Sequence, residues 1–132
     1  MTAIVEFDPV GAESIKGALG PDAAILPGLD ALKSHLDVNV FEDCVVLGPS
    51  VDQQDVFALA EEMRLRRPSL GVVMVRRRID TAILSDALRS GVREVVQERD
   101  LAGLAVAVRR QREIATRLRE QIERPEGGEP VL

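Results

Sequence analysis

Short apolar segments alternate with segments of helical periodicity five times along the 132-residue chain. The apolar segments consist mainly of Val, Ile, Leu and Ala, and the third, residues 44–47 (Cys-Val-Val-Leu), has no polar alternation. Such a segment is typical of a central strand that helices cover on both sides. The five predicted strands are residues 3–7, 23–26, 44–47, 70–75 and 92–96. A helix is predicted after each strand, and the last begins at Asp100 and runs to about residue 123.

Residues that favour helix starts mark several of the predicted boundaries. Asp8 stands before Pro9, which predicts an N-cap followed by a proline in the first helical position. Ser50 with Gln53 three residues later predicts a capping box for the third helix. Asp80 is predicted to cap the fourth helix. The apolar positions of this fourth helix, which are predicted to face the core, are Ile83, Leu84, Ala87 and Leu88.

Strands that alternate with helices through short connections predict a parallel three-layer α/β sandwich. Because such crossovers are right-handed, few topologies remain, and the flavodoxin-like strand order 2-1-3-4-5 is favoured among them. We expect residues 1–124 to form this domain, with a long C-terminal helix. Residues 125–132 are rich in Pro, Gly and Glu and are predicted to be a linker towards a further domain.

The composition excludes several classes of function. Three Phe and no Tyr or Trp argue against a base-stacking nucleic-acid surface, so no nucleic-acid partner is expected. One Cys and one His exclude an intrachain disulfide and a Cys/His zinc site, and neither a metal nor another cofactor is expected. No segment approaches the roughly 20 apolar residues that cross a bilayer, and the N-terminus lacks the features of a signal peptide. We therefore expect a cytoplasmic protein without membrane insertion.

The net charge of −5 conceals two halves of opposite charge. Residues 1–63 contain twelve acidic and two basic residues, whereas residues 64–132 contain ten acidic and fifteen basic residues, all of them Arg. Genome composition can account for the use of Arg rather than Lys, but not for the segregation. A fold that keeps the halves apart is strongly dipolar, which affects the choice of partner and the rate of association. We expect the partner at the arginine-rich edge formed by the fourth and fifth strands and the last helix.

Residues 87–96, Ala-Leu-Arg-Ser-Gly-Val-Arg-Glu-Val-Val, resemble the segment that joins the fourth helix to the fifth strand in response-regulator receiver domains. The resemblance extends over roughly residues 2–112 and implies a CheY-like fold. Receivers that accept a phosphoryl group place an acidic pair after the first strand, an Asp after the third, a hydroxyl after the fourth and Lys-Pro after the fifth. The carboxylates hold Mg²⁺ and attack the phosphoryl donor, while the lysine and the hydroxyl hold the charge of the product.

The residues of this chain depart from that set. Glu6 and Asp8 can supply the acidic pair, but the acceptor position falls on Gly48, which has no side chain. The other two positions fall on residues 75–76, which are Val-Arg, and on residues 97–98, which are Gln-Glu. The resemblance therefore implies a receiver fold with a vacant phospho-acceptor position. Without a third acid, we expect Asp8 to be a helix cap and Glu6 a surface carboxylate rather than a magnesium site.

The vacant acceptor position, the segment at residues 91–96 and the Pro/Gly-rich end resemble a narrower group. This group is the atypical receiver domain at the N-terminus of TadZ/CpaE-type proteins, the MinD/ParA-like ATPases of tight-adherence (Flp) pilus assembly. The resemblance implies a localisation and protein-interaction module whose partners belong to a pilus or secretion assembly machine, at the cell pole or the inner face of the membrane. No P-loop motif occurs here, so we expect no enzyme activity in this chain and any ATPase in a C-terminal domain outside it.

Arg76, Arg77 and Arg78 follow the fourth predicted strand, at the edge where open α/β sheets bind ligands. Three guanidinium groups at this edge allow three interpretations. They can bind the carboxylates of a partner, or an anionic nucleotide or second messenger, which makes a ligand-sensing domain the alternative function. They can also form a solvated loop that pairs locally with Asp80, Glu98 or Glu6.

The final predicted helix keeps a heptad rhythm in its apolar positions, which are Leu101, Leu104, Val108, Ala115, Leu118 and Ile122. Its length leaves two alternatives: a polar tail, or a homodimer through this helix or the adjoining face of the fourth helix. In the dimer, the flanking arginines at 109, 110, 112, 117 and 119 select acidic partners. Of the remaining reactive residues, Cys44 is predicted to be a buried apolar residue and His35 to lie on an exposed helix face.

Overall fold

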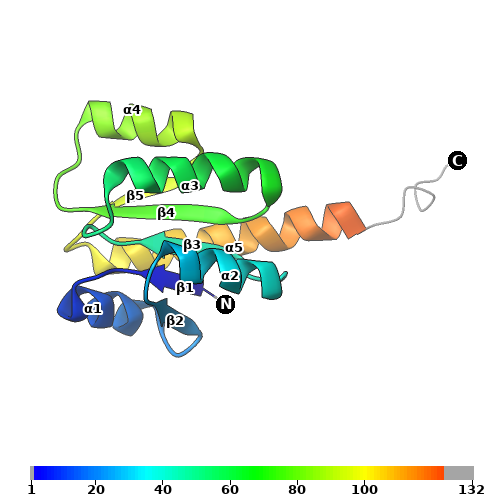
Figure 1. Ribbon diagram of the computed structural model, residues 1–132, viewed down its shortest axis with the longest axis horizontal. Coiled ribbons are helices and arrows are strands. Elements are labelled where there is room, and N and C mark those ends of the chain that lie inside the picture. Colours follow the sequence, from blue (N-terminus) through cyan, green and yellow to red (C-terminus); the bar gives the residue numbers. More distant parts are fainter. Residues whose placement is uncertain (1, 124–132) are drawn as a thin grey trace, which may run out of the picture.

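Five parallel strands form one sheet in the computed structural model, which describes residues 2–123 and the side chains as far as residue 121 (Figure 1). The strands lie in the order β2-β1-β3-β4-β5, as predicted. Their bounds are β1 (Thr2–Val5), β2 (Ala23–Leu26), β3 (Cys44–Leu47), β4 (Gly71–Arg76) and β5 (Glu94–Gln97). The predicted linker at residues 125–132 lies outside the described residues.

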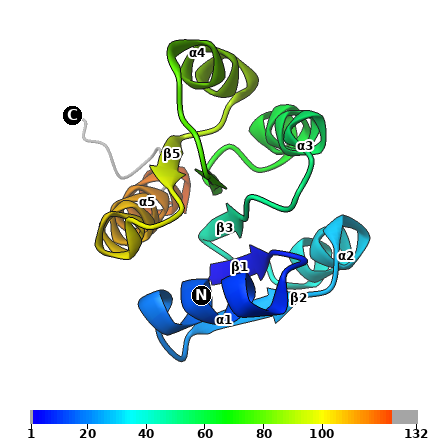
Figure 2. The same cartoon turned by 90° about the vertical axis from the view of Figure 1, so that its left-hand side faces the viewer.

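A helix follows every strand, and the helices form the two outer layers (Figure 2). Their bounds are α1 (Pro9–Leu19), α2 (Leu29–Val38), α3 (Gln53–Arg66), α4 (Thr81–Ser90) and α5 (Leu101–Glu123). Helices α1 and α5 cover one face of the sheet, whereas α2, α3 and α4 lie on the other side (Figure 2). The structure thus confirms a flavodoxin-like α/β sandwich with a long last helix.

The core is divided by the sheet into two apolar clusters. Val45 and Leu47 of β3 enter the cluster beneath α2 and α3, while Cys44 and Val46 enter the cluster beneath α1 and α5. Because successive side chains of a strand point to opposite faces, a strand covered on both faces must be apolar throughout. The absence of polar alternation in this segment is explained by that double burial.

Two of the predicted helix starts are confirmed, and a glycine ends one of these helices. Asp8 caps α1 by accepting a hydrogen bond from the Gly11 N–H group at 3.1 Å. Asp80 caps α4 by accepting one from the Ile83 N–H group at 2.8 Å. Gly91 ends α4 with φ of 108°, in the left-handed region that favours glycine.

The capping box predicted for α3 is wrong. The cap is Asp52, whose carboxylate accepts a hydrogen bond from the Gln54 N–H group at 2.8 Å. Ser50 lies two residues earlier, and its hydroxyl donates to the carboxylate of Glu6. The first predicted strand is also too long, because β1 ends at Val5 and Glu6 begins the following loop. Both corrections concern the same small region at the carboxyl edge of the sheet.

Helix α4 buries less of its apolar face than predicted. Ala87 is fully buried and Ile83 packs partly against the core, but Leu84 and Leu88 are exposed, the latter by 61%. The reason is the position of the helix, which lies beside α3 at one end of the layer rather than over the centre of the sheet (Figure 2). A row of apolar side chains therefore remains on the outside of α4.

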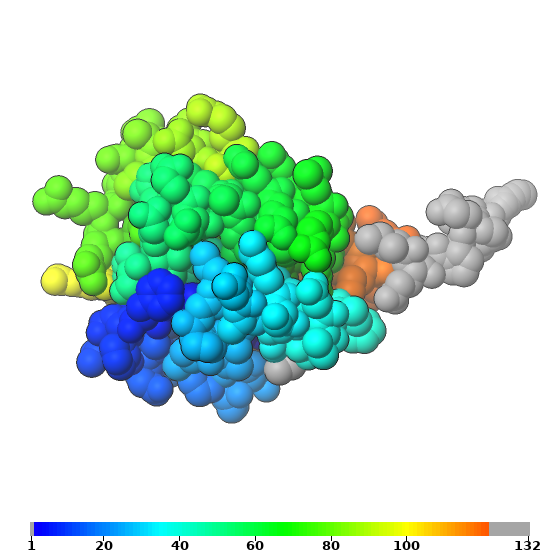
Figure 3. Space-filling model, viewed as in Figure 1, coloured from blue at the N-terminus to red at the C-terminus, as the bar shows by residue number. Residues whose placement is uncertain are grey.

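The 23 residues of α5 span about 35 Å, against about 13 Å for a four-residue strand. The helix therefore extends past the sheet at its amino edge, where the C-terminal ends of the helices lie (Figures 1 and 3). Among the described helices, none is both long and apolar enough to cross a membrane.

Cys44 is buried, as predicted, and burial raises the pKa of its thiol to about 12, with the Glu42 carboxylate adding to the effect. Since the thiolate is the reactive form, we expect N-ethylmaleimide to leave Cys44 unmodified in the folded chain near neutral pH and to label it once denaturant unfolds the chain. Mass spectrometry of quenched samples measures the labelling. A Ser85→Cys variant, whose thiol lies on the exposed side of α4, is the control and reacts at once. Rapid labelling of Cys44 in native buffer would contradict the packing described here.

Candidate functional site

The carboxylate of Glu6 is buried at the carboxyl edge of the sheet, in the loop that follows β1. Its oxygens accept hydrogen bonds from the backbone N–H of Ser50 at 2.9 Å and from the Ser50 hydroxyl at 2.5 Å. The N–H group of Asp8 donates a further bond at 3.2 Å. The expectation that Glu6 is a surface carboxylate is therefore wrong, because it is buried and three donors from the loops after β1 and β3 hold it.

Gly48, the position where the resemblance to receivers places a phospho-acceptor, lies directly beneath this carboxylate. A Cβ atom built on Gly48 would lie 2.2 Å from Glu6 Oε1 and 2.8 Å from Glu6 Cβ, far closer than real carbon and oxygen atoms approach. The backbone is fixed as well, because the Gly48 N–H donates to the Val5 carbonyl at 2.9 Å. The space above position 48 is thus occupied by a neighbouring side chain.

Arg76, the last residue of β4, holds the same loop from the other side. Its guanidinium donates to the carbonyl of Val51 at 2.7 Å and to that of Pro49 at 3.3 Å. Its Nε atom is buried and has no hydrogen-bond acceptor among the described residues. Burial lowers the pKa of this guanidinium, against the opposite effect of the Asp52 and Glu6 carboxylates. The loop after β3 is therefore held between an acidic side chain and a basic one.

The three consecutive arginines do not converge on one site. Arg76 turns towards the loop after β3, whereas Arg77 and Arg78 are exposed. Arg77 pairs with Glu98 at 3.3 Å, one of the local partners considered from the sequence. Such an exposed pair contributes little to stability. A clamp of three guanidinium groups around one small anion is therefore not formed in this structure.

The chemistry available at this edge is that of a closed structural site. Of the predicted acidic pair, Glu6 is bound to Ser50, while Asp8 caps α1. No cluster of three or more His, Cys, Asp or Glu side chains that could hold a metal ion occurs in the part of the chain that the structure describes. With a glycine at position 48, this edge offers no carboxylate to a phosphoryl donor there.

The apolar stripe of α5, predicted as a dimer face, is used inside the domain. Leu104, Val108 and Ala115 are buried, and Leu101 packs against the same core cluster, because this stripe faces the sheet. Leu118 is half-buried. The predicted seam is therefore wrong for these buried positions, and the side chain of Ile122 lies outside the described residues.

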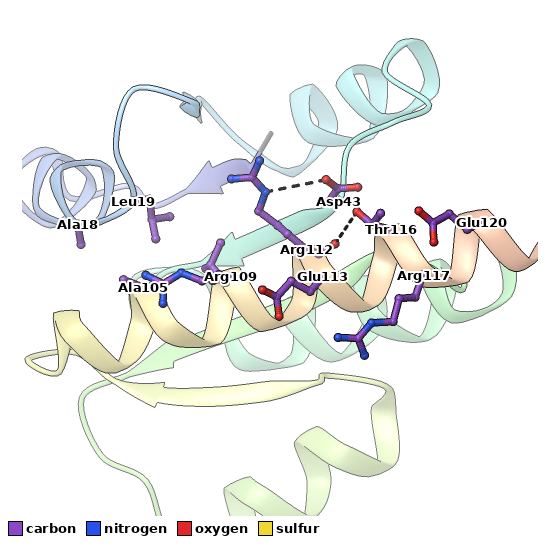
Figure 4. Close-up of a pocket in the computed structure, with 11 residues that line it drawn as sticks. Ala18, Leu19, Asp43, Ala105, Arg109, Arg112, Glu113, Thr116, Arg117 and Glu120 are labelled. Carbon is purple, nitrogen blue, oxygen red and sulfur yellow. Dashed lines mark hydrogen bonds and ion pairs between the residues drawn. The ribbon is translucent and has the colours of Figure 1, made fainter.

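Three of the arginines of α5 have partners within the chain. Arg110 makes two hydrogen bonds of 2.7 Å with Glu94 on β5, which lower the pKa of that carboxyl. Arg119 pairs with Asp43, just before β3, and Arg112 lies 3.9 Å from the same carboxylate. Figure 4 shows Arg112 reaching Asp43 across an open groove of about 670 Å³ between α1 and α5. The last described turns of α5 are thus attached to the domain and do not form a separate polar tail.

His35 was expected on an exposed helix face, and this is wrong. The ring is largely buried, and Nε2 lies 2.5 Å from a carboxylate oxygen of Glu42. Asn39 approaches the other ring nitrogen, Nδ1, at 3.2 Å. The sequence signal was an amide residue four positions after His35 and an acidic residue seven positions after it. These residues, Asn39 and Glu42, both lie in the loop before β3.

Two residues that hold loops at the carboxyl and amino edges of the sheet were not predicted from the sequence. Ser50 was assigned to a helix cap, whereas it holds Glu6 in place. The guanidinium of Arg67, directly after α3, donates to four backbone carbonyls at the end of α2 and in the loop that follows it. Neither role leaves a signal in spacing, because each depends on a contact across the fold.

No protein-family model and no curated protein matches the chain. Solved structures do match it. The signal receiver domain of an HD domain-containing protein from Pseudomonas fluorescens is similar with a TM-score of 0.78 and 18% identity, over 91% of each chain. An atypical orphan response regulator, described as revealing a phosphorylation-independent regulatory mechanism, has a TM-score of 0.73 and 14% identity over 85% of this chain and 94% of its own. A pilus assembly-related protein from Burkholderia pseudomallei has a TM-score of 0.68 and 19% identity over 86% of this chain and 89% of its own.

These likenesses, at identities below 20%, establish the fold. The chain has the architecture of a response-regulator receiver, CheY-like, with the same five-stranded order. Within that architecture it carries a glycine beneath a buried glutamate at the end of β3. The molecule is thus a receiver-like domain.

The contact between Gly48 and Glu6 can be tested by a double-mutant cycle. We expect Gly48→Ala to lower the free energy of unfolding by about 1–3 kcal/mol, because the added methyl group collides with Glu6. In a Glu6→Ala background the same substitution costs at least about 0.5 kcal/mol less, since the carboxylate that it meets is gone. Urea denaturation followed by circular dichroism measures all four proteins.

Gly17→Ala in α1 is the matched control for this cycle. No atom lies within 4 Å of a Cβ built there, so the substitution is expected to stabilise the chain by up to about 1 kcal/mol. Equal costs of Gly48→Ala in the two backgrounds would show that Glu6 does not occupy the space above Gly48.

Proposed function

We propose that the chain is a pseudo-receiver, a receiver-like domain that works without phosphorylation. The observation that carries this proposal is the Glu6 carboxylate, which lies over Gly48 and is bound to Ser50. It places a carboxyl group of the chain itself next to the position where the resemblance expects a phosphoryl group. Because the loop after β3 is also held by Arg76, the edge is built to stay in one arrangement.

We further infer that the domain is a protein-interaction and localisation module of a Flp pilus assembly ATPase of the TadZ/CpaE type. Support comes from the sequence resemblance to that group and from the similarity to a pilus assembly-related protein. An atypical orphan regulator with the same fold is described by a phosphorylation-independent mechanism. In this proposal the domain is not itself an enzyme, and ATP hydrolysis belongs to a C-terminal domain outside this chain. Its partners are proteins of the assembly machine, which bring it to the cell pole or the inner face of the membrane.

The absence of a phosphorylation response is a direct test of the pseudo-receiver. Addition of beryllofluoride with Mg²⁺ to the ¹⁵N-labelled chain is expected to leave the amide signals of residues 48–52 and 75–78 unshifted, because no carboxylate at position 48 can bind it. A receiver with an acceptor aspartate, measured under the same conditions, is the positive control. Saturable shifts in those two segments would refute the proposal.

The localisation role predicts a separation of two properties in the natural protein. Deletion of residues 1–124 is expected to disperse a fluorescent fusion that otherwise forms foci and to reduce the number of pili. ATP hydrolysis by the purified remainder is expected to stay at the level of the undeleted protein, since this domain carries no part of that chemistry. Foci and pili that persist after the deletion would contradict the role in placement, whatever the result with beryllofluoride.

A further inference from the structure

The last two turns of α5 are attached to the domain differently from the rest of the helix. Earlier turns are anchored by buried side chains, the last of which is Ala115. Among the described side chains from residue 116 to residue 121 none is buried, and Leu118 is half-buried. We call residues 116–123 the arm. Because the arm gains little from apolar burial, its position depends on polar contacts.

Arg119 makes two such contacts. Its guanidinium pairs with the carboxylate of Asp43 and lies over the Phe41 ring, 5.8 Å from the ring centre. The backbone at Asp43 is fixed, because its carbonyl accepts a hydrogen bond from the Gly71 N–H group at 3.0 Å. The side chains of Asp43 and Arg119 are only 10% and 24% exposed. A pair so shielded from water is stronger than an exposed one, so it holds the arm against the domain.

Asp43 has a second guanidinium partner, which lies outside the arm. Arg112 is 3.9 Å from Asp43 Oδ2 (Figure 4), whereas Arg119 contacts Oδ1. Arg112 belongs to the part of α5 that buried side chains anchor. The Asp43 carboxylate therefore keeps a positive partner when Arg119 leaves. Breaking a buried ion pair is costly mainly because it leaves an uncompensated charge, so the second partner lowers the cost of detaching the arm.

We propose that the arm is a releasable element of the domain, which is closed by Arg119 on Asp43 and opens when Arg119 moves into solvent while Arg112 keeps the carboxylate. In the closed arrangement, α5 continues in one direction past the amino edge of the sheet (Figure 1). In the open arrangement, the arm bends or unwinds, and the side of the Phe41 ring that Arg119 covers becomes accessible. The arm then no longer leaves the domain in a fixed direction. This device works in the domain itself and does not require a role in pilus assembly.

Hydrogen exchange of the full ¹⁵N-labelled chain, followed residue by residue by NMR, tests this device. Arg119→Gln removes the charge that closes the arm, and we expect the amides of residues 117–121 to exchange roughly tenfold faster or more, because local opening controls their exchange. The amides of residues 104–111 are expected to keep their rates, since buried side chains anchor that segment. Arg117→Gln is the matched control, because it removes the same charge from the arm, and Figure 4 shows Arg117 turned away from Asp43. Its arm amides are expected to exchange at the native rates.

Arg112→Gln distinguishes a releasable arm from a static network of ion pairs. The substitution removes the partner that keeps the Asp43 carboxylate when Arg119 leaves. Detaching the arm then becomes more costly, so we expect the arm amides to exchange more slowly than in the native chain. In a static network, both substitutions would instead loosen the arm. Arm exchange that is not slowed by Arg112→Gln, or not accelerated by Arg119→Gln, would overturn the proposal, as would equal acceleration over the whole of α5.

The direction of the arm can be measured separately with two spin labels, attached at Ser85→Cys on α4 and Glu120→Cys on the arm. Both sites are exposed, whereas the native Cys44 is buried and is expected to stay unlabelled. Pulsed electron paramagnetic resonance of the labelled chain is expected to give one narrow distance distribution. In the Arg119→Gln background a second, broader population is expected, because the arm is released in part of the molecules. One narrow distribution in both backgrounds would contradict a releasable arm.

Discussion

The carboxylate of Glu6 fills the space that any side chain at position 48 would need, and much of the carboxyl edge is arranged around it. Three donors from the loops after β1 and β3 satisfy its charge, which a buried carboxylate requires. Because Ser50 binds Glu6 and does not cap α3, the cap of α3 is Asp52, two residues later than predicted. The carbonyls of Pro49 and Val51 in the same loop accept hydrogen bonds from Arg76 at the end of β4. One interaction thus accounts for the misplaced cap and for the divided arginine run.

The proposed function differs from that of a phospho-accepting receiver in whether the group at this edge of the sheet changes. A receiver that accepts a phosphoryl group gains negative charge at this edge and loses it again by hydrolysis. Here the group at this edge is the Glu6 side chain, and hydrogen bonds from Ser50 hold the loop after β3 against it. In the proposed pseudo-receiver function, the domain has no such cycle at this edge and is suited to a constant role.

The fold followed from the sequence because alternation of strands and helices is a local pattern, and so did the caps Asp8 and Asp80. The sequence also shows that position 48, where the resemblance places a phospho-acceptor, is a glycine without a side chain. That Glu6 occupies the space above Gly48 was not predictable from the sequence. The contact joins residues 42 positions apart and depends on the register of β1 with β3. The stripe of α5 misled for a related reason: a heptad rhythm describes a helix that packs on a sheet as well as one that packs on another helix.

The arginine-rich half now has a structural explanation that charge counting does not supply. Arg64, Arg67, Arg76 and Arg93 each donate to backbone carbonyls of another loop or helix end of the fold. Arg67 reaches four carbonyls with one planar group, which the single ammonium of a lysine, with three donors, is unable to match. The hydrogen bonds of these four arginines fix loops and helix ends around a small sheet whose core contains little aromatic surface. Part of the arginine excess in residues 64–132 therefore serves to hold neighbouring loops and helix ends in place.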